Sequence, residues 1–199
     1  MAVAIAICAL VFTIASFWYL NLFPGRVSGI PAHIFAGHAS ATRGLLRLPI
    51  VIYNSGAIPK VVTEMQLILT SGDECDKMPT QAVRFSLDPK PDDRKDFFHA
   101  FVVPGRSVIT QYVDFQAQGA PRAMVTGEPS EARVEMRLGT DARWKTLCIS
   151  PLRTDSMADP GLMITYSNSP AHWPDRQLER AAVALAGVRS GIPGKRAGG

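Results

Sequence analysis

The chain lacks the short motifs that mark common enzyme sites. Its 199 residues contain no G-x-S-x-G, H-E-x-x-H, C-x-x-C or phosphate-binding glycine-rich loop. These absences exclude the familiar forms of those hydrolase, zinc, dithiol and nucleotide sites. We therefore predict no catalytic residue, no cofactor-binding residue and no metal ligand, and we expect a protein that is not an enzyme.

Charge is absent from the opening stretch, residues 2–23. As a helix rising about 1.5 Å per residue, this stretch would span roughly 33 Å, enough to cross a hydrocarbon core of about 30 Å. Trp18 and Tyr19 lie near its end, where amphipathic rings favour the headgroup layer, and Pro24-Gly25 ends the helix before Arg26. We predict a transmembrane anchor that contacts membrane lipid through residues 2–23.

Two other interpretations of this stretch are a cleaved signal peptide and a buried core helix. A signal peptide usually opens with Lys or Arg and closes on a small-residue cleavage site. Here the apolar stretch begins at Ala2 and ends in bulky residues. Its length and lack of charge favour an uncleaved anchor.

Cysteine is scarce, with three in the chain. Cys8 lies in the apolar stretch, where a lone thiol behaves as a small hydrophobe. Cys75 lies in a polar segment, SGDECDKMP. Cys75 and Cys148 are the two cysteines outside the apolar stretch. We predict a disulfide between Cys75 and Cys148, which would close a loop of roughly 70 residues and contribute about 4 kcal/mol. The alternative is two buried free thiols.

The predicted disulfide favours an oxidising compartment. Arg26, directly after the anchor, weakly favours a cytoplasmic position for the residues that follow, but large domains translocate largely regardless of charge. We predict a single-pass cell-membrane protein with its soluble domain on the extracytoplasmic side.

The formal net charge of +4 and the isoelectric point near 9.1 raise the question of nucleic acid. Basic and acidic residues alternate through the body, as in residues 92–96, DDRKD, and form no basic stripe. We predict no nucleic-acid partner.

A period-two pattern begins at Leu45. In LRLPIVIYN, Leu46, Leu48, Ile50 and Ile52 share one face. Seven short strands separated by Pro, Gly and Asp turns predict an all-β antiparallel sandwich of seven to eight strands, with a barrel as the alternative. The expected strands begin at residues 45, 59, 81, 97, 107, 131 and 144, and a possible eighth covers 162–166.

The stretches LPIVIYNSGAIPKVVTEMQLIL, FVVPGRSVITQYVDF and WKTLCI resemble those of uncharacterised single-pass bacterial membrane proteins whose outer part is an immunoglobulin-like or fibronectin-like sandwich. The resemblance covers about residues 45–150. It implies architecture and assigns no activity to any residue.

Possible metal sites fail on ligand spacing. His33 and His38 have no Cys or carboxylate beside them, so we interpret them as solvated loop residues. A blue-copper site would need a histidine soon after Cys148, but the next one is His172. In residues 92–96, Arg and Lys interrupt the acids that a calcium loop would need.

We expect four regions: an anchor (1–23), a linker (24–44), a β domain (45–168), and a short helix with a disordered basic tail (169–199). In the last region, one helical face carries Leu178, Ala181, Ala182, Leu185 and Val188. This helix either packs on the domain or presents a partner-binding surface.

The sequence predicts a membrane-anchored, non-enzymatic interaction or structural module with a protein partner. The alternative is an accessory subunit or enzyme of the cell envelope with an unrecognised ligand pocket. A deep pocket around His99, Asp114 or Trp144 would favour that alternative.

Overall fold

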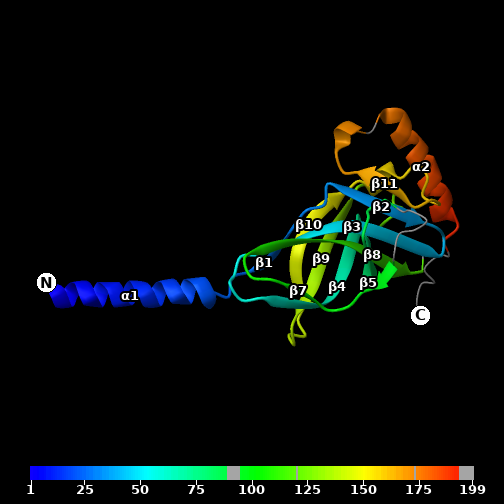
Figure 1. The fold of residues 1–199 in the computed structure, drawn as a ribbon. Coiled ribbons are helices and arrows are strands. Elements are labelled where there is room, and N and C mark those ends of the chain that lie inside the picture. The colour runs from blue at the N-terminus through cyan, green and yellow to red at the C-terminus, as the bar shows by residue number, and fades with distance from the viewer. Residues whose placement is uncertain (89–94, 120, 173, 193–199) are drawn as a thin grey trace.

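The computed structural model describes residues 1–88, 95–119, 121–172 and 174–192. One long helix, α1 (Ala2–Asn21), projects from a β body, and a second helix, α2 (Asp175–Ser190), lies at the opposite end of that body (Figure 1). α1 buries none of its residues, and by length and composition it can cross a membrane. The predicted apolar N-terminal helix is confirmed.

Eleven strands form one antiparallel sheet in the described ranges. Their bounds are β1 (Val27–Ile30), β2 (Ile34–Ala39), β3 (Arg43–Asn54), β4 (Lys60–Ser71), β5 (Glu74–Arg84), β6 (Lys95–Phe97), β7 (Phe101–Val103), β8 (Ser107–Gln118), β9 (Ser130–Leu138), β10 (Lys145–Leu152) and β11 (Ile164–Ser167). Short 3-10 turns cover Thr154–Ser156 and Pro170–His172.

The sheet curls into a half-barrel because the two halves of β5 pair with different strands. Its first half pairs with β4 and its second half pairs with β8. The main strand order is β10-β9-β4-β5-β8-β3-β2-β11, with β1 beside β3, β6 beside β5 and β7 beside β4. The curl also brings β1 against the outer strand β10 (Figure 1).

The core lies inside this curl, and its residues follow the predicted alternation. Leu46, Leu48, Ile50 and Ile52 of β3 are all at most 1% exposed. Burial alternates in the same way along β9, whose inward residues belong to the same core as those of β3 and β4. Apolar side chains at every second position therefore close the antiparallel all-β body around one core.

The prediction of a linker over residues 24–44 is wrong. The segment supplies β1 and β2, which pair with opposite halves of one edge of β3. Phe35 in β2 is fully buried and stacks on Tyr166 of β11, with ring centroids 5.5 Å apart. Glycine and proline made this segment resemble a spacer, but its strands are short and are held by pairing on a long neighbour.

The C-terminal helix packs on the body. Ala181 and Leu185 of α2 are fully buried, and Leu185 belongs to the central core. Leu178 and Val188 are half-buried, whereas Ala182, predicted on the same face, is exposed. Of the predicted disordered tail, residues 193–199 lie outside the described residues.

Candidate functional site: the junction between α1 and the β body

Three backbone segments meet where α1 enters the body. The amide of Ala57 donates to the carbonyl of Phe23 at 2.7 Å, and the amide of Ser55 donates to the carbonyl of Arg26 at 3.0 Å. The amide of Arg106 in turn donates to the carbonyl of Gly56 at 2.7 Å. The chain leaving α1 is thus bonded to the β3–β4 loop, which is bonded to the β7–β8 turn.

Glycines allow these segments to touch. A Cβ on Gly25, whose φ is +51°, would lie 2.0 Å from the amide nitrogen of Gly56. A Cβ on Gly105 would lie 2.0 Å from the carbonyl oxygen of Ala57. Both distances are far inside van der Waals contact, so side chains at Gly25 and Gly105 would force the segments apart.

Asn54, at the end of β3, connects two of the segments from within. Its side chain is fully buried. The amide nitrogen Nδ2 donates to the carbonyls of Ile58, Val103 and Pro104 at 3.0, 3.3 and 3.1 Å, and Oδ1 accepts from the amide of Gly56 at 3.0 Å. One side chain therefore fixes the two loops on which α1 rests.

Arg106 reaches from the β7–β8 turn to the last turns of α1. Its guanidinium donates to the carbonyl of Tyr19 and lies 5.0 Å from the centroid of the Tyr19 ring. α1 has no basic residue in its own last turn, so Arg106 supplies a cation near the negative end of the helix dipole. The Arg106 φ of +51° places a non-glycine residue in the sparsely populated left-handed region.

Aromatic rings complete the junction. Phe23 contacts the rings of Trp18 and Tyr19, with centroids 5.7 and 5.6 Å apart. These groups offer packing, a cation and hydrogen bonds, and they include no nucleophile beside a base. The arrangement can hold a helix at a fixed angle and has no chemistry for bond cleavage.

Sequence reasoning missed this junction, although the chain carries a signal for it. The tripeptide Pro-Gly-Arg occurs twice, at residues 24–26 and 104–106, and both copies lie at the junction. From the sequence we predicted that the first copy ends the helix. Only the fold shows that a turn in the middle of the chain returns to the end of α1.

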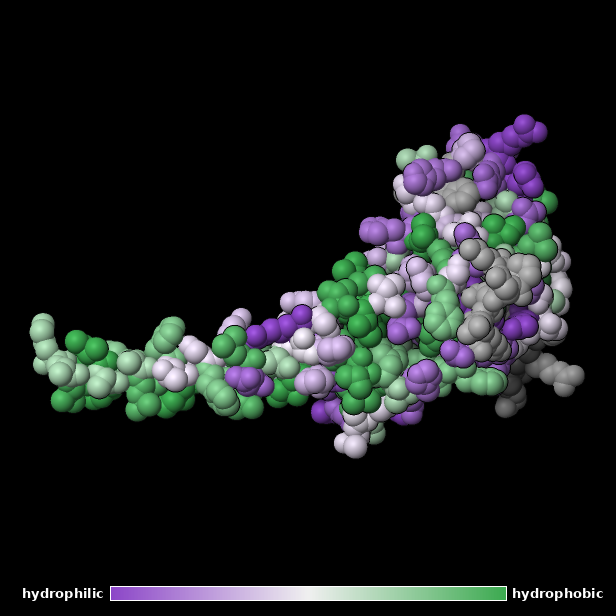
Figure 2. Space-filling model, viewed as in Figure 1, coloured by the Kyte–Doolittle hydropathy of each residue, from purple (hydrophilic) through white to green (hydrophobic). Residues whose placement is uncertain are grey.

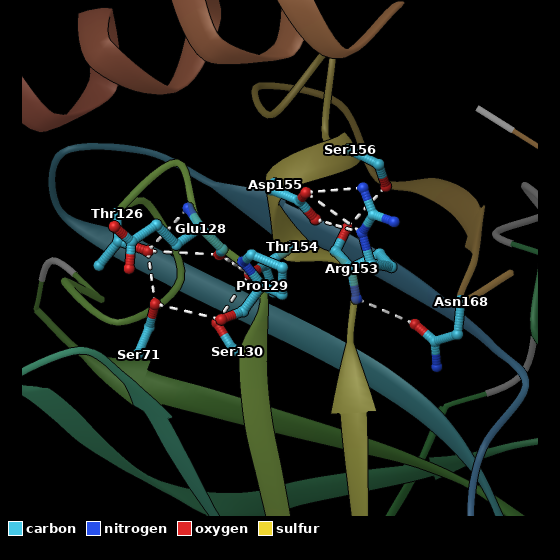
Figure 3. A network of polar contacts seen from close by, with 10 residues as sticks. All are labelled: Ser71, Thr126, Glu128, Pro129, Ser130, Arg153, Thr154, Asp155, Ser156 and Asn168. Atoms are coloured by element: carbon cyan, nitrogen blue, oxygen red, sulfur yellow. Dashed lines mark hydrogen bonds and ion pairs between the residues drawn. The ribbon is translucent and has the colours of Figure 1, made fainter. Parts of the chain in front are cut away.

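A second polar cluster lies at the opposite end of the body, beneath α2 (Figure 3). The hydroxyls of Ser130 and Thr154 are 2.7 Å apart and buried, and those of Ser71 and Thr126 are also 2.7 Å apart. In Figure 3, Ser71 at the end of β4 lies beside Thr126 of the β8–β9 loop, and Ser130 at the start of β9 lies beside Thr154 of the 3-10 turn after β10. The cluster satisfies buried hydroxyls and supports α2.

The same view shows Arg153 turned back on its neighbour Asp155. Nε and Nη2 of Arg153 lie 2.8 Å from the two carboxylate oxygens of Asp155, and this pairing raises the pKa of the Arg153 guanidinium. The Arg153 amide donates to Oδ1 of Asn168 at 3.1 Å. These contacts are local and fix the chain between β10 and β11.

A buried ion cluster sits on the outer face of β3, β8 and β5. Arg47 and Asp114 are 3% and 1% exposed, and Nε of Arg47 lies 2.7 Å from Oδ1 of Asp114. Nε of Arg84 lies 2.9 Å from the other carboxylate oxygen. Arg47 also donates to the carbonyls of Ser86 and Leu87, so the cluster fastens the chain after β5 to the sheet.

The predicted disulfide is absent, because Cys75 and Cys148 are both free thiols. Cys75 pairs with exposed Thr70 on the outer face, whereas Cys148 pairs with buried Val134 and packs against the core. Along β5, β4, β9 and β10 the two lie three strand spacings apart, about 14 Å, where a bridge needs Cα atoms within about 7 Å. Opposite faces and this separation prevent the bond.

Cys148 instead fills space beside β1. A Cβ on Gly29 would lie 3.2 Å from the Cys148 sulfur, so the strand approaches the thiol closely. Burial raises the pKa of the Cys148 thiol to about 11. Cys148 is therefore a half-buried free thiol, close to the alternative of buried thiols, whereas Cys75 is exposed.

The histidines do not assemble a metal site. In the described ranges, no three His, Cys, Asp or Glu side chains form a group that could hold an ion. His33 and His172 both line a cleft of about 490 Å³ between β10 and β11, whereas His38 lies in β2. Most of the suggested calcium loop, residues 92–94, lies outside the described residues.

Of the three residues suggested as pocket markers, His99 and Asp114 are connected through Arg84, whereas Trp144 lies apart from them. His99 lines a cleft of about 360 Å³ with Arg84 and Tyr112. Asp114 is enclosed in its ion cluster. Trp144 lies on another surface, with the guanidinium of Arg137 4.4 Å from its ring centroid.

No protein-family model matches the chain, and no curated protein is similar to it in sequence. Among solved structures, the chain is similar to the crystal structure of a protein from Archaeoglobus fulgidus. The two share 10% identity over 71% of this chain and 98% of the other, with a TM-score of 0.36.

Proposed function

We propose that this protein is a single-pass membrane protein in which α1 carries a non-enzymatic β domain, an interaction or structural module for a protein partner, at a fixed angle to the bilayer. The observation that carries the proposal is the pairing of an unburied apolar helix with a built junction. α1 buries nothing against the body, yet its last turns are bonded to that body through Arg106.

The surface of α1 supports a lipid environment. Its large side chains are widely exposed, for example Leu10 at 61% and Phe12 at 73%. Figure 2 shows this hydrophobic surface running the length of the projecting helix. A continuous apolar surface of that size is unfavourable in water and is covered when the helix enters a bilayer.

The same proposal includes an immunoglobulin-like sandwich as the fold of the β body. Two antiparallel layers, one around β3 and β8 and one around β4 and β9, share a single core, and this supports an immunoglobulin-like sandwich. Domains of this architecture commonly act by presenting loops and strand edges to partners. The polar clusters described above satisfy buried groups and support the fold, which favours a module over an enzyme.

The alternative, an envelope enzyme or accessory subunit with a ligand pocket, is favoured by one observation. In the cleft between β10 and β11, the hydroxyl of Ser167 lies 2.9 Å from Nδ1 of His172. A hydroxyl beside an imidazole is the minimum for a nucleophile and its base. Covalent labelling of Ser167 by a fluorophosphonate probe would support this alternative, and an unlabelled Ser167 would favour the module.

The extracytoplasmic position stays a prediction, now without the disulfide as support. Arg26 and Arg106 both lie beside the end of α1, and such cations favour the cytoplasmic side. Cys75 is exposed, so it reports the side directly. In intact cells, a membrane-impermeant maleimide labels Cys75 if the domain is outside and labels it only after lysis if the domain is inside.

Membrane fractionation tests the anchor, and amide hydrogen exchange tests the junction. The full chain should sediment with membranes and resist carbonate extraction, and recovery in the wash would reject the anchor. Arg106→Ala should stay in the membrane but speed amide hydrogen exchange at residues 22–27, because the body then loses its bond to Tyr19. Arg143→Ala, an exposed cation in the β9–β10 turn, is the matched control.

A further inference from the structure

The end of the body next to α1 combines positive charge with exposed apolar side chains. Four segments form this end: residues 22–30, 53–62 and 102–110, and the β9–β10 turn, whose Gly139 amide donates to the carbonyl of Val61. The first three contain Arg26, Lys60 and Arg106 and no aspartate or glutamate, and the turn adds Arg143 and Lys145 beside Asp141. Cations therefore outnumber acids at this end of the body.

Apolar side chains lie between the cations. Val61 and Val102 are directly paired across β4 and β7 and are 40% and 54% exposed. Ile58 is 37% exposed and Val108 is 57% exposed. Figure 2 shows hydrophobic patches mixed with hydrophilic residues on the part of the body nearest α1.

We infer that this end of the body is a lipid-contact surface that seats on anionic headgroups. Lipid is the expected partner because this surface is continuous with α1. Trp18 and Tyr19 mark the headgroup level, and the β3–β4 loop is bonded to Phe23, only a few residues further along. Once α1 spans the bilayer, this surface faces the headgroups.

The chemistry of the surface suits that position. Arginine and lysine pair with lipid phosphates, and each cation near an anionic surface strengthens attraction about fivefold. Valine and isoleucine rest at the boundary between headgroups and acyl chains, where their exposure to water falls. The junction holds the surface in place, so seating needs no further ordering of the chain.

This inference rests on the proposed membrane anchor, and full-length protein in lipid nanodiscs tests both. An NBD fluorophore is placed on Ile58→Cys in a chain without other cysteines (Cys8→Ala, Cys75→Ser, Cys148→Ala). The comparison label sits on Cys75 alone, about 35 Å away along β4. Nanodiscs contain phosphatidylcholine either alone or mixed with phosphatidylglycerol, together with a spin-labelled quencher lipid.

We expect quenching at position 58 that increases with phosphatidylglycerol, and little quenching at position 75. Neutralising Arg26 and Lys60 together by glutamine should reduce the ratio of protein with this surface on the headgroups to protein with it lifted off about 25-fold, and should weaken the dependence on phosphatidylglycerol. Arg180→Gln on α2 removes an exposed cation at the far end and should change nothing. Arg106 is left intact so that the junction is not altered.

The outcomes separate the two ideas. A full chain that fails to enter nanodiscs would reject the anchor itself. A chain that enters, but shows the same quenching at position 58 with and without phosphatidylglycerol and in the neutralised variant, would overturn the lipid-contact surface while leaving the anchor in place.

Discussion

Replacing Asn54 by alanine tests how the junction is held together. The Asn54 amide makes four hydrogen-bond contacts within the protein, three through Nδ2 and one through Oδ1. An amide nitrogen carries two hydrogens, so these contacts amount to about three full bonds, worth roughly 1 kcal/mol each. We expect Asn54→Ala to lower the free energy of unfolding by about 3 kcal/mol and the melting temperature by roughly 6–12 °C.

The assay is urea denaturation of residues 24–199, since α1 buries no residue in the core and its removal leaves that core intact. Asn54→Asp sharpens the test, because it keeps the shape of the side chain but turns a charged oxygen toward three carbonyls. It should cost more than Asn54→Ala at neutral pH and less in acid, where the protonated carboxyl can donate. Ser55→Ala, which loses bonds to the exposed backbone of Arg26, is the control.

A loss below about 1 kcal/mol for Asn54→Ala would refute this account of the junction. So would an aspartate variant that is milder than the alanine variant at neutral pH. Either result would mean that the backbone bonds kept in residues 24–199, from Ser55 to Arg26 and from Arg106 to Gly56, suffice to hold the loops.

Three further predictions concern the core and the thiols. Leu185→Ala should cost about 2–5 kcal/mol in urea unfolding, whereas Val183→Ala on the exposed face of α2 should stay within about 0.5 kcal/mol. In native protein at neutral pH, iodoacetamide should alkylate Cys75 well before Cys148, as mass spectrometry of quenched samples would show; equal rates would contradict the burial of Cys148. Burial raises the pKa values of Cys148 and Tyr166 from 9.0 and 10.0 to about 11 and 12, so the folded state keeps protons that the unfolded state has lost. Stability should be complete below pH 9 and fall as the pH rises through those raised values, a trend that Cys148→Ala should weaken in pH-dependent urea melts.

Alternation of apolar residues was enough to predict the longest strands. The stretch from Leu45 predicted a strand with Leu46 and Ile52 inward, and β3 covers Arg43–Asn54 with both buried. A long strand buried on one face repeats its pattern often enough to be recognised. The apolar N-terminal helix was predictable for a similar reason, because an uncharged stretch of its length is rare in soluble proteins.

Short strands and long-range pairs were not predictable. β1 contains four residues, so its alternation is too brief to separate from a loop, and only pairing with β3 defines it. The disulfide prediction failed because the count of cysteines carries no information about faces. Cys75 lies in a strand that begins at Glu74, where the sequence suggested a polar loop. Arg106 was missed because its role depends on Tyr19, far away in the chain.

The pairing of β3 with β8 has a consequence for the order of events during synthesis. β3 cannot complete its central pairing until β8, which ends at Gln118, has been made. About 100 residues separate the end of α1 from that point, or roughly 5–20 s of translation at 5–20 residues per second. Under the proposed function, α1 is therefore presented to the insertion machinery while the rest of the chain is still unfolded. The proposed anchor can then enter a bilayer before any folded domain exists to obstruct it.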